Sequence, residues 1–232
     1  MEKNSHSNSN ILEITTLNQL FSDNYKSILL IGESDTSKTL SISFFILNLV
    51  KEKNITPEEI SIIDFGPPKF QRSGVFIGGK VIDYLDIFTK KYPELQKVRY
   101  ILKEDKFRAP RSDAKNTQHV LNLCFKNWQK AREHLKIYEK DPTSVLIIND
   151  LSIYLHMGSL SQIKRIKEKA NIFFANAYSG KRLLMDMGSN ISSAEIRLLK
   201  KFSESMDVTF KTTLIFNNEV VSKFKELNNS AN

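Results

Sequence analysis

The sequence is poor in cysteine and lacks long apolar segments. Its single cysteine, Cys124, cannot form a disulfide within the chain, so we predict no disulfide framework and expect a reducing compartment, the cytoplasm. The most apolar run, residues 40–50, contains serine and asparagine and is far shorter than the stretch of about 20 residues that crosses a bilayer. We interpret it as a buried helix and expect no membrane association.

Linkers, internal repeats and long heptad runs are also missing. A chain of 232 residues without a Gly/Ser-rich break is long enough for one sizeable core. We therefore predict a single domain over residues 11–220. It is preceded by an Asn/Ser-rich disordered tail at residues 1–10 and followed by a C-terminal tail at residues 221–232.

The spacing of the histidines argues against two further kinds of site. His6, His119, His134 and His156 have no metal-ligand spacing with one another or with Cys124. A metal site built only from protein ligands is therefore not predicted. No Ser-His-Asp or Cys-His arrangement with a recognisable local signature is present either.

Positive charge exceeds negative charge in the chain. A net charge of +8 and a pI near 9.4 suit a polyanionic partner such as nucleic acid, with lysines that only solvate the surface as the alternative. Arg108 and Arg111 lie in a basic predicted loop, where they either contact phosphate or nucleic acid or belong to a solvated connector. Lys181 and Arg182 follow a predicted strand, so one of them is a candidate for stabilising charge at the functional edge.

Short apolar runs alternate with helical stretches along the chain. Strands are predicted at residues 26–31, 59–64, 144–150 and 170–178, helices at 39–53, 114–140 and 192–204, and a final strand or hairpin at 207–216. Residues 73–84 are predicted to form a hairpin or irregular loop, and residues from 217 on a short element and a tail. Ser192 and Glu195 have the spacing of a capping box. The alternation predicts an α/β fold with a mostly parallel sheet and helices on both faces.

A phosphate-binding loop is the most specific motif in the sequence. Between an apolar strand and an apolar helix lie Gly32, Glu33, Ser34, Asp35, Thr36, Ser37, Lys38 and Thr39. In the P-loop pattern of strand, loop and helix, backbone N–H groups face the phosphates. Lys38 would then reach the β- and γ-phosphates, and the Thr39 hydroxyl would bind Mg²⁺.

Ser37 departs from this pattern, because it stands where the P-loop has its second glycine. That glycine commonly has a backbone conformation that residues with a Cβ adopt poorly. Serine there is expected to cost about 1–2 kcal/mol, which weakens the site without abolishing it.

Two carboxylates end predicted strands and are candidates for the chemistry. Asp150 follows an apolar run that ends in Asn149, and it is predicted to hold Mg²⁺. Asp64 ends another apolar run, and it either orients an attacking water as general base or simply terminates its strand. The turn that follows, residues 65–68, is rich in glycine and proline, at the edge where open α/β sheets bind ligands.

This layout resembles P-loop NTPases of the RecA/KaiC-like branch. The resemblance rests on the P-loop, Asp64 and Asp150 at their strand ends, and it covers residues 26–216. It implies ATP or another nucleoside triphosphate with Mg²⁺ as ligand, with Lys38 on phosphate, Thr39 on Mg²⁺ and Asp150 as the strand-end aspartate. Together with Asp64, which is a candidate by its position, Lys38 and Asp150 are the predicted catalytic residues. Assembly of several copies through RecA-like contacts would also be in keeping with this branch. Ser37, and the lack of a glutamate after the Asp64 strand, predict slow or partner-stimulated hydrolysis.

Two narrower resemblances keep other functions open. Residues 148–160 are similar to a stretch of corrinoid adenosyltransferases, and Asp35 with residues 64–68 is similar to polynucleotide 5′-kinases. The chain is therefore an NTP-binding ATPase, a phosphoryl- or adenosyl-transferase on the same fold, or a degenerate P-loop module that binds a partner or nucleic acid.

Overall fold

A computed structural model describes residues 11–22, 24–72, 74–183 and 185–229. The predicted N-terminal tail, residues 1–10, lies outside the described residues. None of the described helices combines the length and apolarity that a membrane span requires.

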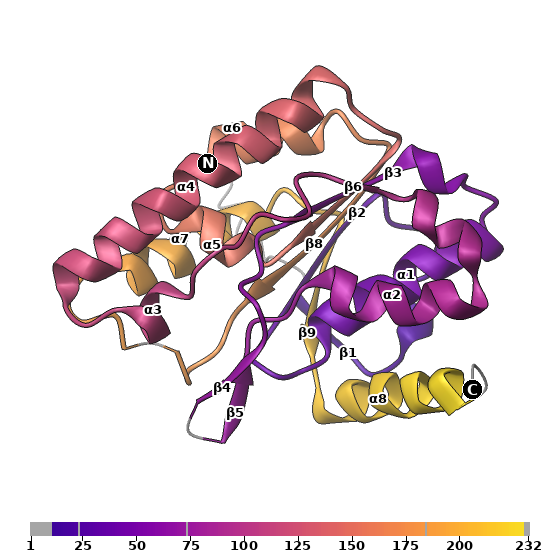
Figure 1. Ribbon diagram of the computed structural model, residues 1–232, viewed down its shortest axis with the longest axis horizontal. Helices are drawn as coiled ribbons and strands as arrows, with labels where there is room; N and C mark the ends of the chain where they lie inside the picture. Colours follow the sequence, from indigo (N-terminus) through magenta and orange to yellow (C-terminus); the bar gives the residue numbers. More distant parts are fainter. Residues whose placement is uncertain (1–10, 23, 73, 184, 230–232) are drawn as a thin grey trace, which may run out of the picture.

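A seven-stranded parallel sheet forms the centre of the molecule (Figure 1). Its strands are β1 (Ile11–Ile14), β2 (Ser27–Gly32), β3 (Ile60–Asp64), β6 (Arg99–Tyr100), β7 (Val145–Asn149), β8 (Ile172–Tyr178) and β9 (Val208–Thr212). They lie in the order β1-β9-β2-β8-β7-β3-β6, and every neighbouring pair is parallel. Two further strands, β4 (Phe70–Arg72) and β5 (Val75–Ile77), form a separate antiparallel hairpin.

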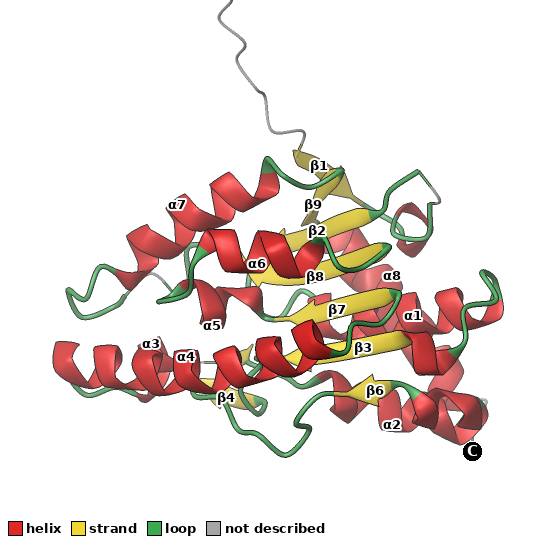
Figure 2. Ribbon diagram, turned by 90° about the horizontal axis from the view of Figure 1, so that it is seen from above, coloured by secondary structure: helices red, strands yellow, loops and turns green. Residues whose placement is uncertain are grey.

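Helices cover both faces of this sheet (Figure 2). One face packs against α1 (Lys38–Lys51), α2 (Val81–Lys91) and α8 (Leu214–Asn229). The other face packs against α4 (Thr117–Lys140), α5 (Leu151–Leu155), α6 (Leu160–Lys167) and α7 (Ile191–Ser203). A short helix, α3 (Pro110–Asp113), precedes α4, and short 3-10 turns occupy Leu17–Gln19, Pro57–Glu59 and Pro93–Lys97. The predicted α/β fold is therefore confirmed.

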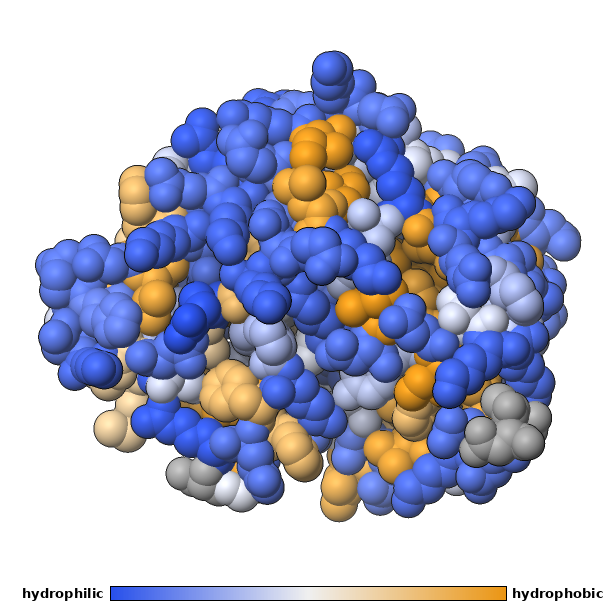
Figure 3. All heavy atoms as spheres, in the orientation of Figure 1, coloured by the Kyte–Doolittle hydropathy of each residue, from blue (hydrophilic) through white to orange (hydrophobic). Residues whose placement is uncertain are grey.

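The alternation of side chains along each strand explains the two layers. In β2, Ile28 and Leu30 enter one core, whereas Leu29 and Ile31 enter the other. Because successive side chains of a strand point to opposite faces, a strand that is apolar throughout must be covered on both sides. On the face that Figure 3 shows, hydrophilic residues dominate and hydrophobic residues lie in separate groups.

Three segments differ from the sequence predictions. Residues 73–84 contain the end of the hairpin, but α2 already begins at Val81. The predicted capping box is wrong, because α7 begins at Ile191 after Asn190, which places Ser192 inside the helix. Residues 214–229 form a helix, α8, and Val220 packs into the core where a short element and a tail were predicted.

The register of the sheet brings the predicted site residues to one edge. Gly32 at the end of β2 pairs with Tyr178 of β8, and Asp64 at the end of β3 pairs with Asn149 of β7. Because all these strands are parallel, their carboxyl ends and the loops that follow them lie together, as is usual for ligand sites of open α/β sheets.

Candidate functional site

The loop between β2 and α1 has the features of an anion-binding site. The first helical hydrogen bond of α1 runs from the Ser41 N–H to the Ser37 carbonyl, at 2.8 Å. The N–H groups of Lys38, Thr39 and Leu40 therefore have no acceptor within the helix. Unpaired N–H groups and the positive end of the helix dipole together favour a negatively charged ligand.

Gly32 is required at the start of this loop for steric reasons. A Cβ at this position would lie 1.9 Å from the Thr212 hydroxyl oxygen of β9. The same hydroxyl donates to the Thr36 hydroxyl, at 3.0 Å. The beginning of the loop is thus packed tightly against the neighbouring strand.

Ser37 occupies a strained backbone conformation. Its φ of 57° and ψ of 16° lie in the left-handed region, as expected for the position of the second glycine. Its hydroxyl donates to the Asn217 Oδ1 atom in the first turn of α8, at 2.5 Å. This contact with a distant helix compensates part of the strain, and nothing local in the sequence indicates it.

Lys38 is satisfied by the loop itself. Its ammonium group donates to the Gly32 carbonyl at 3.0 Å, to the Glu33 carbonyl and to the Thr36 hydroxyl at 3.3 Å. Burial lowers the pKa of Lys38 to about 8, against the opposing effects of Asp150, Glu33 and Asp35. A phosphate group would offer this cation stronger, charge-assisted acceptors than carbonyl oxygens.

Thr39 contacts Asn149 at the end of β7. The Thr39 hydroxyl donates to Asn149 Oδ1 at 3.2 Å, and the Asn176 amide of β8 donates to the same oxygen at 2.8 Å. The Asn149 amide nitrogen donates to Asp64 Oδ1 at 2.7 Å and to the Gly79 carbonyl at 3.0 Å. Asn149 therefore ties together the ends of several strands with all of its hydrogen-bonding capacity in use.

Asp64 is a buried anchor for the segment that follows β3. Its carboxylate accepts hydrogen bonds from the N–H groups of Gly66 and Val81, both at 2.8 Å, and from the side chains of Asn149 and Tyr100. Burial raises the pKa of Asp64, while these four donors act in the opposite direction. The chain thus encloses the Asp64 carboxylate, which does not line the cavity described below.

Asp150 lies at the cavity described below, which Asp35 of the loop also lines. The Asp150 backbone is left-handed, with φ of 52° and ψ of 57°, and its N–H donates to Asn176 Oδ1 at 2.7 Å. Within the described chain, its carboxylate accepts no hydrogen bond. Burial, with a further contribution from Glu195, raises the pKa of Asp150 to about 7, although Lys38 and Arg111 act against this.

A cavity of about 300 Å³ connects these groups. Residues 34–40 of the loop line its floor. At one end the wall is largely apolar and comes from Phe76 of the hairpin, Tyr84 of α2 and Phe224 of α8. At the other end it is polar and includes Asp150, Arg111, Ser152, His156, Asn176 and Tyr178. Sequence reasoning missed the apolar wall, because its residues come from three separate elements without a shared motif.

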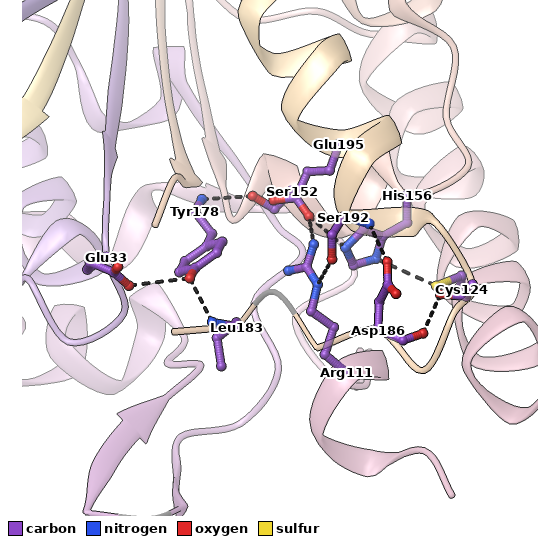
Figure 4. Close-up of polar contacts among 11 residues, drawn as sticks. Glu33, Arg111, Cys124, Ser152, His156, Tyr178, Leu183, Asp186, Ser192 and Glu195 are labelled. Atoms are coloured by element: carbon purple, nitrogen blue, oxygen red, sulfur yellow. Dashed lines mark hydrogen bonds and ion pairs between the residues drawn. The ribbon is translucent and has the colours of Figure 1, made fainter. Parts of the chain in front are cut away.

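The polar end continues into a network of buried side chains (Figure 4). Arg111 forms an ion pair with Glu195 of α7 and donates through Nε to the Ser192 hydroxyl at 3.2 Å. His156 Nε2 lies 3.1 Å from the same Glu195 carboxylate, and its Nδ1 lies 3.7 Å from the Cys124 sulfur. The residues of the predicted capping box are therefore partners of Arg111.

The other predicted basic residues lie elsewhere. Arg108 is exposed and pairs with Asp113 at 2.7 Å. Lys181 donates its backbone N–H to Glu33 at 2.5 Å, and neither Lys181 nor Arg182 lines the cavity. In the described part of the chain, no cluster of three or more His, Cys, Asp or Glu side chains could hold a metal ion.

Comparisons with known proteins leave the family open. No protein-family model matches the chain, and no curated protein sequence is significantly similar to it. Among solved structures, the Pif1 helicase from Candida albicans is similar, with a TM-score of 0.37 and 14% sequence identity. The match covers 90% of this chain, which spans only 40% of the helicase chain.

Proposed function

We propose that this chain binds a nucleoside triphosphate, ATP by default, in the cavity above residues 32–39. One observation carries the proposal: the unpaired N–H groups at the start of α1, with Lys38 and Thr39, line the same cavity as the open carboxylate of Asp150. In this arrangement the triphosphate lies along the loop. Lys38 exchanges its carbonyl acceptors for phosphate oxygens, and the helix dipole stabilises the negative charge.

The oxygen donors at the site fit a nucleotide-bound Mg²⁺ ion. Mg²⁺ prefers hard oxygen ligands and usually keeps several waters, with one or two carboxylates and substrate phosphates as its other contacts. The Thr39 hydroxyl and the Asp150 carboxylate supply such donors, whereas Asn149 is already saturated and Asp64 is enclosed. When bound, the ion would neutralise charge on the phosphate oxygens.

The apolar end of the cavity suits the base and ribose. Phe76, Tyr84 and Phe224 line this end together with Val221 and Leu40. The Lys69 ammonium lies over the Phe76 ring, 4.5 Å from its centre, and would move aside for a base to stack on that face. Stacking on aromatic side chains is tolerant of base identity, because every base has a π-face. The site therefore has a place for each part of a nucleotide, with the terminal phosphate toward Asp150.

The Asp150 carboxylate faces the cavity without a hydrogen-bond partner among the described residues, so it is available to hold the ion. Its pKa in the free protein is raised to about 7, and a neighbouring Mg²⁺ ion would lower this pKa and favour the ionised form. We therefore assign Asp150 to the ion and not to a general base. Slow hydrolysis is proposed because Ser37 stands in place of the second glycine.

A phosphoryl transferase is the second candidate, and a second cavity favours it. This cavity has a volume of about 220 Å³ and shares Arg111 and Tyr178 with the first. An acceptor held there would lie next to the nucleotide, and its hydroxyl could replace the attacking water.

Thermal unfolding with a panel of nucleotides tests binding, and labelled ATP tests the chemistry. A ligand at 100 times its dissociation constant stabilises the folded state by about 2.7 kcal/mol. We expect this stabilisation with Mg²⁺ and a nucleoside triphosphate, and no stabilisation by any nucleotide at millimolar concentration would overturn the proposal. With γ-labelled ATP, release of free phosphate identifies a hydrolase, and label on an added acceptor identifies a transferase.

A further inference from the structure

Arg111 is a buried cation at the polar end of the nucleotide cavity. We propose that Arg111 is a second phosphate-binding cation, which contacts the terminal phosphate of a triphosphate, and that Glu195 competes with the nucleotide for it. This inference rests on the proposed nucleotide-binding function. It assigns to Arg111 the ability to distinguish a triphosphate from a diphosphate.

The fold places the Arg111 guanidinium at the cavity and restricts its orientation. Only 9% of the side chain is exposed, although α3, which carries it, is a surface element four residues long. The guanidinium carbon lies 5.7 Å from the centre of the Tyr178 ring, and Nε donates to the Ser192 hydroxyl. Both Arg111 and Tyr178 line the cavity, so these contacts hold the guanidinium beside the space that the nucleotide would occupy.

Part of the guanidinium is left without an acceptor. An arginine has five N–H donors in a rigid planar fork. Among the described residues, the Arg111 side chain donates through Nε to Ser192 and through Nη2 to Glu195, and its Nη1 donors remain open. A buried guanidinium with open donors at a cavity wall is well suited to planar recognition of a phosphate group.

Glu195 already occupies the other side of this cation. Its carboxylate is only 2% exposed and accepts from both Arg111 and His156. Arg111 lines both cavities, whereas Glu195 lines only the second one. Glu195 therefore holds the guanidinium from outside the nucleotide cavity. A triphosphate adds several negative charges near Asp150. The Glu195 carboxylate partly neutralises the Arg111 guanidinium and so weakens its attraction for these charges.

The same segment offers a matched control. Arg108 lies three positions before Arg111, but its side chain is 61% exposed and pairs with Asp113 on the surface. Removal of Arg108 changes the net charge by the same amount as removal of Arg111. Because the step from Glu195→Gln to a double variant with Arg111→Met also removes one positive charge, comparing this step with the step from the parent to Arg108→Ala reports the position of the guanidinium and not the overall charge.

Equilibrium titration of four proteins with a non-hydrolysable ATP analogue and with ADP tests the inference. The proteins are the parent, Arg108→Ala, Glu195→Gln and the double variant Arg111→Met with Glu195→Gln. The second substitution is included because Glu195 would otherwise be a buried carboxylate without its ion-pair partner. Circular dichroism serves to check that the double variant folds. We expect the double variant to lose about 10- to 100-fold in affinity for the triphosphate analogue, as for a charge-assisted contact, and less than about threefold for ADP.

The two remaining variants have different expected results. Arg108→Ala keeps the parent preference for triphosphate, whereas Glu195→Gln increases this preference because Arg111 loses its competing partner. The inference is overturned if the double variant keeps the parent preference for triphosphate over diphosphate, or if Glu195→Gln lowers this preference. If the parent protein binds neither nucleotide, the proposed function fails and not only the role of Arg111.

Discussion

Replacement of Asp150 by asparagine should make the protein more stable, although Asp150 is the candidate carboxylate ligand of Mg²⁺. The pKa of this carboxyl is raised from 3.8 to about 7 in the folded protein. Between about pH 4 and pH 7 the folded protein therefore holds a proton that the unfolded chain has released. Because the folded state binds more protons in this range, the free energy of unfolding falls as pH rises, and the loss is complete above pH 7.

The size of the effect follows from the change in pKa. A change from 3.8 to about 7 corresponds to about 4 kcal/mol. Because the Asp150 carboxylate faces a cavity that solvent can enter, screening reduces this to about 2 kcal/mol. Asparagine has a similar shape, carries no charge and tolerates the left-handed backbone of this position. At pH 8 the variant Asp150→Asn should therefore gain about 2 kcal/mol, or about 4–8 °C in melting temperature.

Urea unfolding of the ligand-free proteins at pH 5 and pH 8 measures this gain. Asp86→Asn, a substitution at an exposed position of α2, is the matched control and should leave the stability unchanged at both pH values. The gain of Asp150→Asn should be large at pH 8 and clearly smaller at pH 5. If the variant is less stable than the parent at pH 8, the Asp150 carboxylate is held by a favourable ion pair, and the reasoning is wrong.

Three further predictions concern the loop and the apolar wall. Ser37→Ala and Ser37→Gly both lose the bond to Asn217, but only Ser37→Ala keeps the left-handed strain. Ser37→Ala should therefore be less stable than Ser37→Gly by about 1 kcal/mol in urea unfolding, and the reverse order would refute the strain at this position. Gly32→Ala should destabilise the protein by about 1–3 kcal/mol, and Thr212→Ala in the same chain should restore part of this loss if their collision is the cause. Phe76→Ala removes a side chain that is 40% exposed, so melting of the free protein should change little, while nucleotide affinity should fall by about 1–3 kcal/mol. An unchanged affinity would place the base elsewhere.

The fold was predictable because its signals are local and repeated. Runs such as residues 28–31 are apolar at every position, and this pattern indicates a strand covered on both faces. The loop between β2 and α1 was equally accessible, since a strand, a loop and a helix follow one another directly in the sequence. The left-handed conformation of Ser37 follows from its place in that motif.

The remaining parts of the site depend on contacts between distant residues. Ser192 and Glu195 have the spacing of a capping box, yet the partner of Glu195 is Arg111, 84 residues away. In the same way, Asn217 belongs to a helix that sequence reasoning missed, because its buried side chains, among them Phe216, Val220 and Leu227, alternate with many polar residues. Local spacing cannot indicate such partners, since a carboxylate at a helix start and a carboxylate in an ion pair have the same sequence pattern.

Sequence patterns also do not show which of the two candidate carboxylates reaches the cavity. Asp64 and Asp150 both end apolar strands; Asp150 is predicted to hold Mg²⁺, and Asp64 is predicted to be either a catalytic residue or a plain strand end. The structure separates them, because backbone N–H groups and two side chains enclose Asp64, whereas Asp150 faces the cavity. The difference arises because the backbone N–H groups of Gly66 and Val81 both reach the Asp64 carboxylate.

The most direct measurement is an isothermal titration of the protein with Mg²⁺ and a non-hydrolysable ATP analogue. The parent and Lys51→Ala, a variant at the opposite end of α1, should bind one analogue per chain with the same affinity, because Lys51 pairs with Glu94 on the surface far along the helix. Lys38→Ala should bind at least about tenfold more weakly, since it loses a charge-assisted contact to phosphate. Equal binding by Lys38→Ala and the parent, or no binding by the parent, would contradict the account.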